Sequence, residues 1–563
     1  MNTCRSENAS DQVNIASYLP AMAERHPDTP AVIIQYGRDP ATGGSRYATH
    51  TLRDLNDASD RVACGLERIG IHRGARTVLM VEPSFEFFAL TFALFKMGAV
   101  PVMVDPGMGV RNLGACLAEA EPEAFIGIPK AHAARIALRW ARKTIKITVT
   151  VGRRWGWGGH TWENIVAGGV LPYPMAPTQA GDIAAILFTS GNTGAPKGAV
   201  YTHGVFDHQV RLIRETYGIE HGEMDVATFP LFALFGPALG MTAIIPDMDA
   251  SRPATADPGR IIEAVTRFHA TNMFGSPALI KNVGRYGVQH NTALPSLRRV
   301  LSAGAPADTE AIEDFTKLLA PGVEIFTPYG ATEALPVASI GSAVILAETA
   351  RKTANGAGTC VGVPVCPGSV SIIRITDEPI AEWSDDLRLP QGEIGEIVVR
   401  SPVATTAYYN RPHATALSKI RDTRDGGIHH RMGDIGYFDE QGRLWFCGRK
   451  NHRVVTKDGT LFTIPCERVF NAHPKVLRTA LAGVERNGGV VPVLCVELRE
   501  RCSRSERDVI KGELLVLGRA RPHTAKITTI LFHPRFPVDV RHNAKITREK
   551  LARLADRKLK GRP

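Results

Sequence analysis

A run of hydroxyl side chains, glycines and one lysine follows an apolar segment and has the chemistry of a phosphate-binding loop. Residues 183–198 read IAAILFTSGNTGAPKG. The glycines allow backbone N–H groups to turn inward and approach a phosphate closely. Thr189, Ser190 and Thr193 add hydroxyl donors, and Lys197 adds a positive charge. The spacing is not that of a Walker A loop, and an ordinary surface loop is the weaker alternative.

Positive charge is concentrated at the C-terminal end of the chain. Residues 501–563 contain 17 Lys/Arg and 6 Asp/Glu, which accounts for the whole net charge of +11. A solvated tail, a nucleic-acid surface and a lid over an anionic substrate are the three alternatives. No basic patch interleaved with aromatic residues accompanies the charge, so nucleic-acid binding is poorly supported.

Short apolar strands alternate with helices around the glycine-rich loop. The pattern predicts a helix over 51–70 and a strand, helix and strand at 76–81, 85–97 and 99–104. Further strands are expected at 183–188, 243–245, 270–274 and 300–302. This alternation is typical of doubly wound α/β sheets. From about residue 368 short β runs separated by Gly/Pro turns predict a β-rich lobe, and the basic stretch after Gly448 is a candidate hinge.

Composition limits the class of protein. The 563 residues are 44% hydrophobic and 22% charged, which is ordinary for a globular protein of at least two domains. Nine cysteines form no CxxC pair, and the N-terminus lacks the basic-then-apolar order of a signal peptide. The apolar stretch 85–104 contains Glu86, Lys96 and Pro101, which favours a buried helix and strand over a membrane span. We expect a cytoplasmic protein without a transmembrane segment.

The phosphate-binding loop resembles that of the adenylate-forming enzymes, which include acyl-CoA ligases, luciferases and peptide-synthetase adenylation domains. Residues 188–198 match the family pattern [Y/F]TSG[S/T]TGxPKG with only Asn192 out of pattern. Other family motifs follow in order along nearly the whole chain: SAGAP (302–306), YGATE (329–333), Gly433-Asp434, Gly448-Arg449 and NAKITR (543–548).

The resemblance implies a fold, two domains, cofactors and a set of site residues. The implied fold is α/β: a large multi-lobed N-terminal adenylation domain over 1–449, with doubly wound sheets and a β-rich lobe, and a small mobile α+β lid domain over 450–563. ATP would be bound by Thr189, Ser190, Gly191, Thr193, Gly194, Lys197, Gly304, Ala305, Tyr329, Gly330, Thr332, Asp434 and Arg449. Thr332, Glu333 and Lys545 would be catalytic, with Glu333 also a ligand of Mg²⁺. The basic C-terminal segment then fits a cationic lid over ATP and a carboxylate.

Departures from the usual acyl-CoA ligase motifs point to one subgroup. FPLFALFGPALGMTAIIPDMD (229–249) lacks the His that many ligases have after the aromatic-Pro motif, residue 451 is Asn, and VDVRHNAKI (538–546) has Ala544 before the lysine. Together with GAVYTHGVF (198–206), these stretches resemble the β-lactone synthetases of bacterial long-chain olefin biosynthesis. The resemblance implies adenylation of a long-chain 2-alkyl-3-hydroxy acid, followed by attack of its own 3-hydroxyl to close a lactone.

Several points stay open at this stage. The alternatives are a medium- or long-chain acyl-CoA ligase and a non-catalytic nucleotide-binding regulator, the latter disfavoured because the motif residues are present. Phe229, Phe232 and Ala233 are candidates for the substrate pocket by motif position. His203, His208 and His542 are candidates by position only for the base that takes the hydroxyl proton. Implied partners are a fatty-acid substrate and the thiolase-like, reductase and lactone-decarboxylase enzymes of the pathway.

Overall fold

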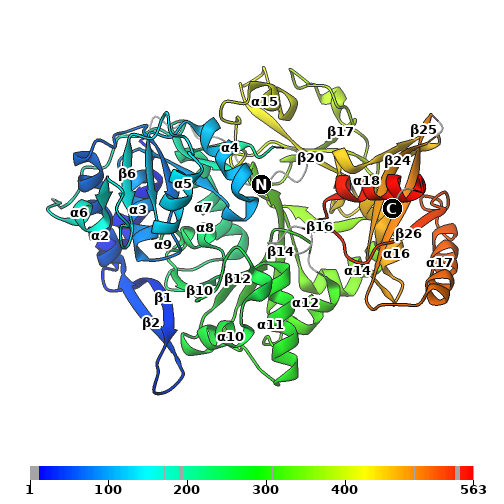
Figure 1. Cartoon of the computed structure of the whole chain (residues 1–563), viewed down its shortest axis with the longest axis horizontal. Coiled ribbons are helices and arrows are strands. Elements are labelled where there is room, and N and C mark those ends of the chain that lie inside the picture. The colour runs from blue at the N-terminus through cyan, green and yellow to red at the C-terminus, as the bar shows by residue number, and fades with distance from the viewer. Residues whose placement is uncertain are drawn as a thin grey trace.

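The structure is a computed structural model with a large N-terminal domain and a smaller C-terminal part (Figure 1). It describes residues 12–169, 171–188, 195–306, 308–486, 488–538 and 546–561. The loop residues Thr189, Ser190, Gly191, Thr193 and Gly194 lie outside the described residues, as do His542 and Lys545. None of the described helices is long and apolar enough to cross a membrane.

The first sheet carries the strand that leads into the phosphate-binding loop. Its order is β7-β6-β5-β3-β4-β8-β9, and the core pairs β5–β3–β4–β8 are parallel. The strands are β3 (Arg76–Met80), β4 (Val100–Val104), β5 (Ala124–Gly127), β6 (Ile147–Thr150), β7 (His160–Thr161), β8 (Ile183–Phe188) and β9 (Gly198–Thr202). Because β4 and β8 are parallel neighbours, both end at the edge where the loop begins. β9 returns antiparallel to β8 before the helix at His203, a strand that sequence analysis missed.

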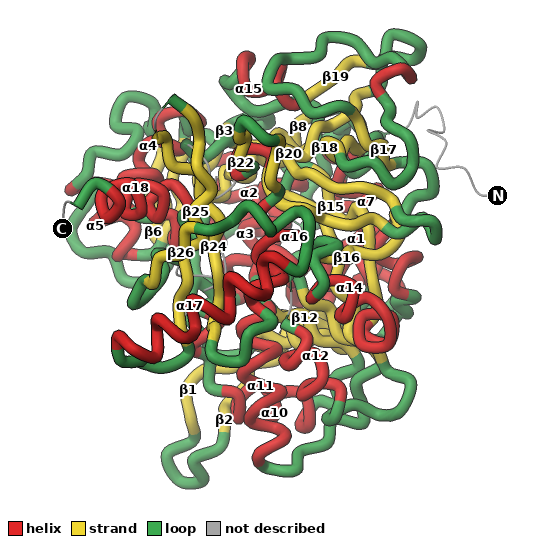
Figure 2. The backbone as a smooth tube through the Cα atoms, turned by 90° about the vertical axis from the view of Figure 1, so that its right-hand side faces the viewer, coloured by secondary structure: helices red, strands yellow, loops and turns green. Residues whose placement is uncertain are grey.

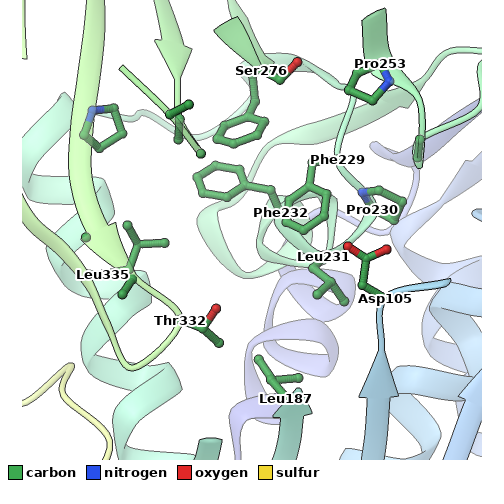
Figure 3. A pocket seen from close by; sticks show the side chains of 18 of the residues that line it. Asp105, Leu187, Phe229, Pro230, Leu231, Phe232, Pro253, Ser276, Thr332 and Leu335 are labelled. Atoms are coloured by element: carbon green, nitrogen blue, oxygen red, sulfur yellow. The ribbon is translucent and has the colours of Figure 1, made fainter. Parts of the chain in front are cut away.

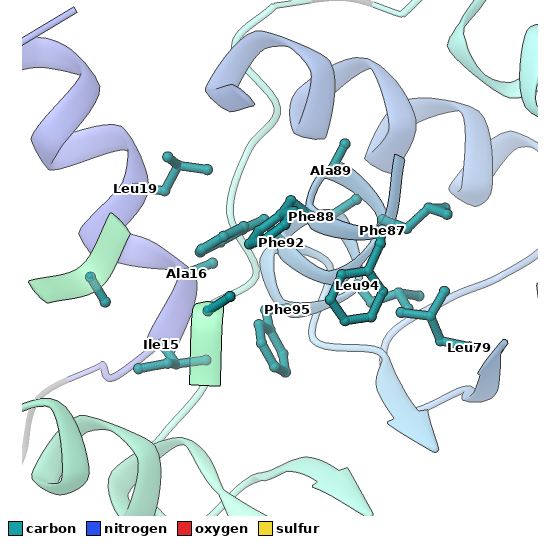
Figure 4. Packing of buried hydrophobic residues seen from close by; sticks show 14 of the residues in the cluster. Ile15, Ala16, Leu19, Leu79, Phe87, Phe88, Ala89, Phe92, Leu94 and Phe95 are labelled. Carbon is teal, nitrogen blue, oxygen red and sulfur yellow. The ribbon is translucent and has the colours of Figure 1, made fainter. Parts of the chain in front are cut away.

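Helices pack against this sheet, and their buried side chains form a hydrophobic core with it. They are α1 (Tyr18–Arg25), α2 (Leu52–Arg68), α3 (Phe85–Lys96), α4 (Val110–Ala120), α5 (Pro129–Ala137), α6 (Trp162–Val166) and α7 (His203–Tyr217). The predicted helix over 51–70 is α2, which begins with a reciprocal capping box between Thr51 and Asp54. Nearly every side chain of α3 is buried, and its phenylalanines pack beside Leu19 and Leu79 (Figure 4). A helix that is apolar on all sides belongs inside the domain, as expected for 85–97.

The second sheet joins an α/β half to the β-rich half of the domain. Its path is β17-β18-β20-β21-β16-β15-β14-β13-β12-β10-β11-β1-β2, with β19 paired to β20. The α/β half comprises β1 (Pro30–Arg38), β2 (Ser45–Thr51), β10 (Met224–Ala227), β11 (Thr242–Ile245), β12 (Asn272–Gly275), β13 (Arg299–Ser302) and β14 (Glu324–Ala331). The β-rich half comprises β15 (Ala334–Gly341), β16 (Thr359–Pro364), β17 (Val370–Ile373), β18 (Gly395–Val399), β19 (Lys419–Arg421), β20 (Ile428–Phe438) and β21 (Leu444–Arg449). The antiparallel hairpin β14–β15 is the junction.

Further helices flank the second sheet. They are α8 (Pro230–Ala233), α9 (Phe235–Leu239), α10 (Pro258–Arg267), α11 (Pro277–Gln289), α12 (Thr309–Thr316), α13 (Ser342–Val344), α14 (Ala350–Ala354) and α15 (Pro412–Ser418). Ile261, Val283 and Phe315 from α10, α11 and α12 share one buried cluster with the strands of the α/β half. The sheet is therefore covered by apolar helix faces, as the alternating pattern predicts.

The C-terminal part has its own three-stranded sheet. β24 (Val476–Arg486), β25 (Gly489–Leu498) and β26 (Thr529–Phe532) pair in that order. The remaining elements are β22 (Val454–Thr456), β23 (Gly459–Leu461), α16 (Thr463–Asn471), α17 (Arg504–Arg519) and α18 (Arg548–Leu559). Figure 2 shows α17 running across this sheet on the side that faces the viewer. Phe470, Leu494 and Leu514 belong to a buried cluster of this part, so it has a core of its own.

Candidate active site

One large cavity collects most of the predicted site residues. Its volume is about 1930 Å³, and it opens where β8, β13 and β14 end and where β20 and β21 pass beside them. Ends of parallel strands are where open α/β sheets bind ligands. The predicted residues that line the cavity are Lys197, Phe229, Phe232, Gly304, Ala305, Tyr329, Gly330, Thr332, Glu333, Asp434 and Arg449. Ala233 is fully buried in the core beside them and is not one of the lining residues.

Asp434 stands at the centre of one polar group in the cavity. It lies on β20 directly opposite Arg449 on β21, and Arg449 Nε is 3.1 Å from Asp434 Oδ1. The hydroxyl of Tyr329 donates to Asp434 Oδ2 at 2.7 Å. Burial raises the pKa of Asp434, while the positive charge of Arg449 opposes that shift. Oδ1 has the ion pair with Arg449 but no aligned hydrogen bond from any described residue, so it can still accept from a ligand hydroxyl such as those of ribose.

Thr332 and Glu333 form the tip of the β14–β15 hairpin. Ala331 pairs with Ala334, so the two residues between them make the turn and project from the sheet. The hydroxyl of Tyr201 donates to the carbonyl of Thr332, which ties this turn to β9. Gly330 is required beside the turn, since a Cβ there would lie 2.6 Å from the carbonyl oxygen of Ala334. The hairpin therefore places Glu333 in the cavity next to the exit of the phosphate-binding loop.

Tyr408 and Lys419 join the site, and sequence analysis singled out neither. The hydroxyl of Tyr408 donates to Glu333 Oε1 at 2.6 Å. The ammonium groups of Lys197 and Lys419 lie 4.9 and 5.9 Å from the centre of the Tyr408 ring. Lys419 is 7% exposed, and burial lowers its pKa to about 7 while Glu333 opposes the shift. A lysine at the start of a β-strand carries no motif signal, so only the fold reveals it.

An apolar region of the cavity adjoins these polar residues. Figure 3 shows Phe229 and Phe232 between Thr332 on one side and Pro253 and Ser276 on the other. Phe232 stacks on Phe274 with ring centres 4.2 Å apart. Other apolar lining residues include Phe92, Phe95, Phe206, Val210, Phe235 and Ala238. A cavity with an apolar end and a polar, charged end suits an amphipathic acid that meets a nucleotide.

Two of the three candidate bases are placed by the structure. His203 is fully buried at the start of α7, and its Nδ1 accepts the backbone N–H of Ile15 at 3.1 Å. Burial lowers the pKa of His203 to about 4. His208 is bonded within the helix through Nδ1, 2.7 Å from the carbonyl of Gly204. Neither histidine is among the residues that line the cavity, so the structure gives neither of them a route to a substrate hydroxyl.

Glu333 is the residue that suits a divalent metal arriving with a nucleotide. Within the described part of the chain there is no cluster of three or more His, Cys, Asp or Glu side chains that could hold a metal alone. Mg²⁺ is commonly bound by one or two carboxylates together with substrate phosphates. The single carboxylate of Glu333, which lines the cavity together with Lys197, fits binding of Mg²⁺ shared with substrate phosphates.

The fold and the cavity define an adenylate-forming enzyme, an ATP-dependent and AMP-forming ligase or synthetase. The chain belongs to the family described as AMP-binding enzyme, which matches residues 19–409. It is 51% identical to an olefin beta-lactone synthetase of Stenotrophomonas maltophilia over 98% of this chain and 99% of that protein. It is also 51% identical to one of Xanthomonas campestris pv. campestris over 96% of this chain and 97% of that protein. The amide bond synthetase McbA of Marinactinospora thermotolerans has the same fold, with a TM-score of 0.77, 23% identity and coverage of 96% and 99%.

Proposed function

We propose that this enzyme activates a long-chain 2-alkyl-3-hydroxy acid with ATP and then closes it to a β-lactone. The observation that carries the proposal is the 51% identity to olefin beta-lactone synthetases along nearly the whole chain. The cavity supports it, since apolar residues around Phe232 adjoin the polar group of Tyr329, Asp434 and Arg449. The segments 229–249 and 538–546, which depart from the usual acyl-CoA ligase motifs, agree with the proposal as well.

The first step is adenylation. A carboxylate oxygen of the acid attacks the α-phosphorus of ATP, the bond to the β-phosphate oxygen breaks, and pyrophosphate leaves with that electron pair. Asp434 accepts from the ribose hydroxyls, and Tyr329 and Arg449 hold its carboxylate in place. The phosphate-binding loop with Lys197 holds the β- and γ-phosphates, and Lys545 compensates charge at the α-phosphate. Glu333 is the residue that would hold Mg²⁺ arriving with ATP, and the metal would supply further charge neutralisation at the phosphates.

The second step is intramolecular. The 3-hydroxyl oxygen attacks the acyl carbon of the mixed anhydride, the bond to the phosphate oxygen breaks, and AMP leaves while the hydroxyl proton is released. The anhydride supplies the energy that strains the four-membered ring. The enzyme contributes orientation, because the apolar walls around Phe229 and Phe232 keep the hydroxyl and the carbonyl together and exclude water.

We also propose a boundary between residues 449 and 450, with 450–563 acting as a lid. β21 ends at Arg449, and the strands that follow pair only among themselves in the described residues. Ile546 and Arg548 of the C-terminal part line the cavity, and Arg453 bonds Asp377 of the N-terminal domain. A basic lid would bring Lys545 to the reacting phosphate. We place the enzyme in the cytoplasm, with thiolase-like, reductase and lactone-decarboxylase enzymes as its pathway partners.

A product assay tests the function. The purified enzyme is incubated with a synthetic long-chain 2-alkyl-3-hydroxy acid, ATP and Mg²⁺, with and without coenzyme A. We expect lactone and AMP without coenzyme A, and no product from a Glu333→Gln control. Thioester formed only with coenzyme A would replace the proposal by the acyl-CoA ligase alternative, and absence of AMP under both conditions would favour a non-catalytic regulator.

A further inference from the structure

At the polar end of the cavity, two carboxylates each accept a hydrogen bond from a tyrosine hydroxyl. Asp434 accepts from the hydroxyl of Tyr329 at 2.7 Å and pairs with the cation of Arg449. Glu333 accepts from the hydroxyl of Tyr408 at 2.6 Å, and the Lys419 ammonium lies 5.9 Å from the centre of the same tyrosine ring. The first group was expected from sequence motifs, whereas Tyr408 and Lys419 have no assigned role.

Backbone pairing connects Tyr408 to the exit of the phosphate-binding loop. The N–H of Val200 donates to the carbonyl of Ala407 at 3.1 Å, and the N–H of Tyr409 donates to the carbonyl of Gly198 at 2.8 Å. Tyr408 therefore lies against the strand that begins directly after Lys197. Its ring is close to the Lys197 ammonium, 4.9 Å from the ring centre, while its hydroxyl reaches Glu333. One side chain thus contacts both the loop lysine and the acidic residue of the hairpin tip.

Lys419 supports Glu333 from the interior. Its ammonium donates to the carbonyl and, at 3.2 Å, to the hydroxyl of Thr405. The N–H of Thr405 in turn donates to the backbone carbonyl of Glu333 at 2.8 Å. Lys419 begins β19, where it pairs with His430 of β20, so its position is set by the sheet and not by the cavity. Lys419 therefore connects the buried sheet to the backbone of Glu333 through Thr405.

We propose that Tyr408 and Lys419 are positioning residues that hold the Glu333 carboxylate ready for the metal-bound triphosphate. Tyr408 fixes one oxygen of Glu333 by its hydrogen bond, and the other oxygen is left for the ligand. Lys419 holds Thr405 through two hydrogen bonds, and the N–H of Thr405 fixes the backbone carbonyl of Glu333. The inference rests on the proposed adenylation, because it concerns how Glu333 presents itself to Mg²⁺ and ATP.

The test compares Lys419→Met, Lys419→Arg and Tyr408→Phe with the wild type. Initial rates of AMP release are measured against Mg²⁺, ATP and acid concentration, and binding of ATP with Mg²⁺ is measured separately by calorimetry. Since loss of a residue that supports a metal ligand typically costs ~10- to 100-fold in metal affinity or activity, we expect Lys419→Met to lower kcat by about tenfold or more. We also expect weaker ATP–Mg²⁺ binding and an unchanged KM for the acid. Lys419→Arg should recover part of both losses because a guanidinium can still donate to Thr405.

A matched control separates this role from general stability. Lys96 is a second buried lysine, 2% exposed and paired with Asp60 away from the cavity. Lys96→Met should lower the melting temperature without changing the Mg²⁺ dependence. If Lys419→Met only lowered the melting temperature, or if Lys419→Arg were as defective as Lys419→Met, the inference would be wrong. Should Lys419→Met fail to fold, Tyr408→Phe carries the test, since it removes one oxygen atom.

The outcomes also separate this inference from the proposed function. A wild-type enzyme that releases no AMP with any hydroxy acid would overturn the proposed function, while the calorimetric comparison of ATP–Mg²⁺ binding would still decide the role of Lys419. A wild-type enzyme that is active, with variants that bind and turn over ATP normally, would overturn only the inference.

Discussion

The hydroxyl of Tyr329 donates a 2.7 Å hydrogen bond to the carboxylate of Asp434, although 105 positions separate the two residues in the sequence. Tyr329 lies on the strand β14 that closes the α/β half of the second sheet, and Asp434 lies on β20 in the β-rich half. The bond therefore connects the two halves of the domain within the proposed nucleotide site. Burial and the Asp434 charge hold the pKa of Tyr329 well above its usual value, so the hydroxyl keeps its proton and remains a donor.

Tyr329→Phe should weaken nucleotide use while sparing the acid. Loss of a hydrogen bond to a charged group costs about 1.5–3 kcal/mol, which corresponds to a ~10- to 100-fold rise in the KM for ATP. Initial rates at varied ATP and at varied acid concentration measure the two constants separately. Tyr437→Phe is the control, because that hydroxyl donates to the carbonyl of Ala357 at 3.0 Å and does not line the cavity. An equal effect of both variants would contradict the assignment of Tyr329.

Lys545→Ala should abolish most adenylation if this lysine compensates charge at the α-phosphate. Groups of this kind typically contribute ~10²–10³-fold in kcat. The measurement is AMP release with saturating ATP and acid. Lys550, an exposed lysine in α18, provides the control variant Lys550→Ala. Unchanged adenylation by Lys545→Ala would show that the motif assignment is wrong.

Ala238→Leu should shift the enzyme toward shorter substrates. Ala238 lines the apolar region of the cavity and is nearly fully buried, so three added carbon atoms reduce the space available to an alkyl chain. One methylene group in a hydrophobic pocket discriminates by about 10- to 200-fold in kcat/KM, and a loss of that order is expected for the longest acids only. A series of acids of increasing chain length gives the profile. A uniform loss at all lengths would indicate a folding defect in place of altered specificity.

Asp225→Asn should stabilise the protein, and more strongly at high pH. Burial raises the pKa of Asp225 to about 7, and the nearby charge of Glu223 adds to the shift. A carboxyl whose pKa is raised on folding contributes stability that is fully present below its usual pKa of 3.8 and is lost as pH rises through about 7. Asparagine carries no charge to bury. Its amide can also donate to Asn272 Oδ1, which is buried without a hydrogen-bond partner among the described residues.

Thermal unfolding at pH 5 and pH 8 checks this expectation. Asp225→Asn should raise the free energy of unfolding more at pH 8 than at pH 5, by about 2 kcal/mol. This is the order of magnitude that the raised pKa of Asp225 implies between these pH values. Asp28→Asn is the control, since the Asp28 side chain is 87% exposed and its variant should behave alike at both pH values. A gain from Asp225→Asn that did not depend on pH would mean that the residue is ionised or solvated in the folded state.

Local sequence determined the elements and most of the proposed nucleotide site. Hydrophobic periodicity and capping residues predicted the strand Ile183–Phe188 and the helix Leu52–Arg68, and the structure has both. These signals are readable in the sequence because they act over a few neighbouring residues. The motif residues Tyr329, Glu333 and Asp434 could be named in advance, since they occur in short runs of recognisable type. The β9 strand was missed because its residues read as part of the loop and helix on either side.

Tertiary structure alone decided which side chains meet. Lys419 begins an edge strand and Tyr408 lies in a loop between elements, and nothing in their neighbours signals a link to Glu333. Their contacts depend on the pairing of β19 with β20 and of residues 407–409 with β9. Ala233 shows the converse, since it lies next to Phe232 in sequence yet turns into the core. Long-range strand pairing and helix rotation set these positions. The identity of a residue and of its neighbours in sequence does not specify which distant element it will contact.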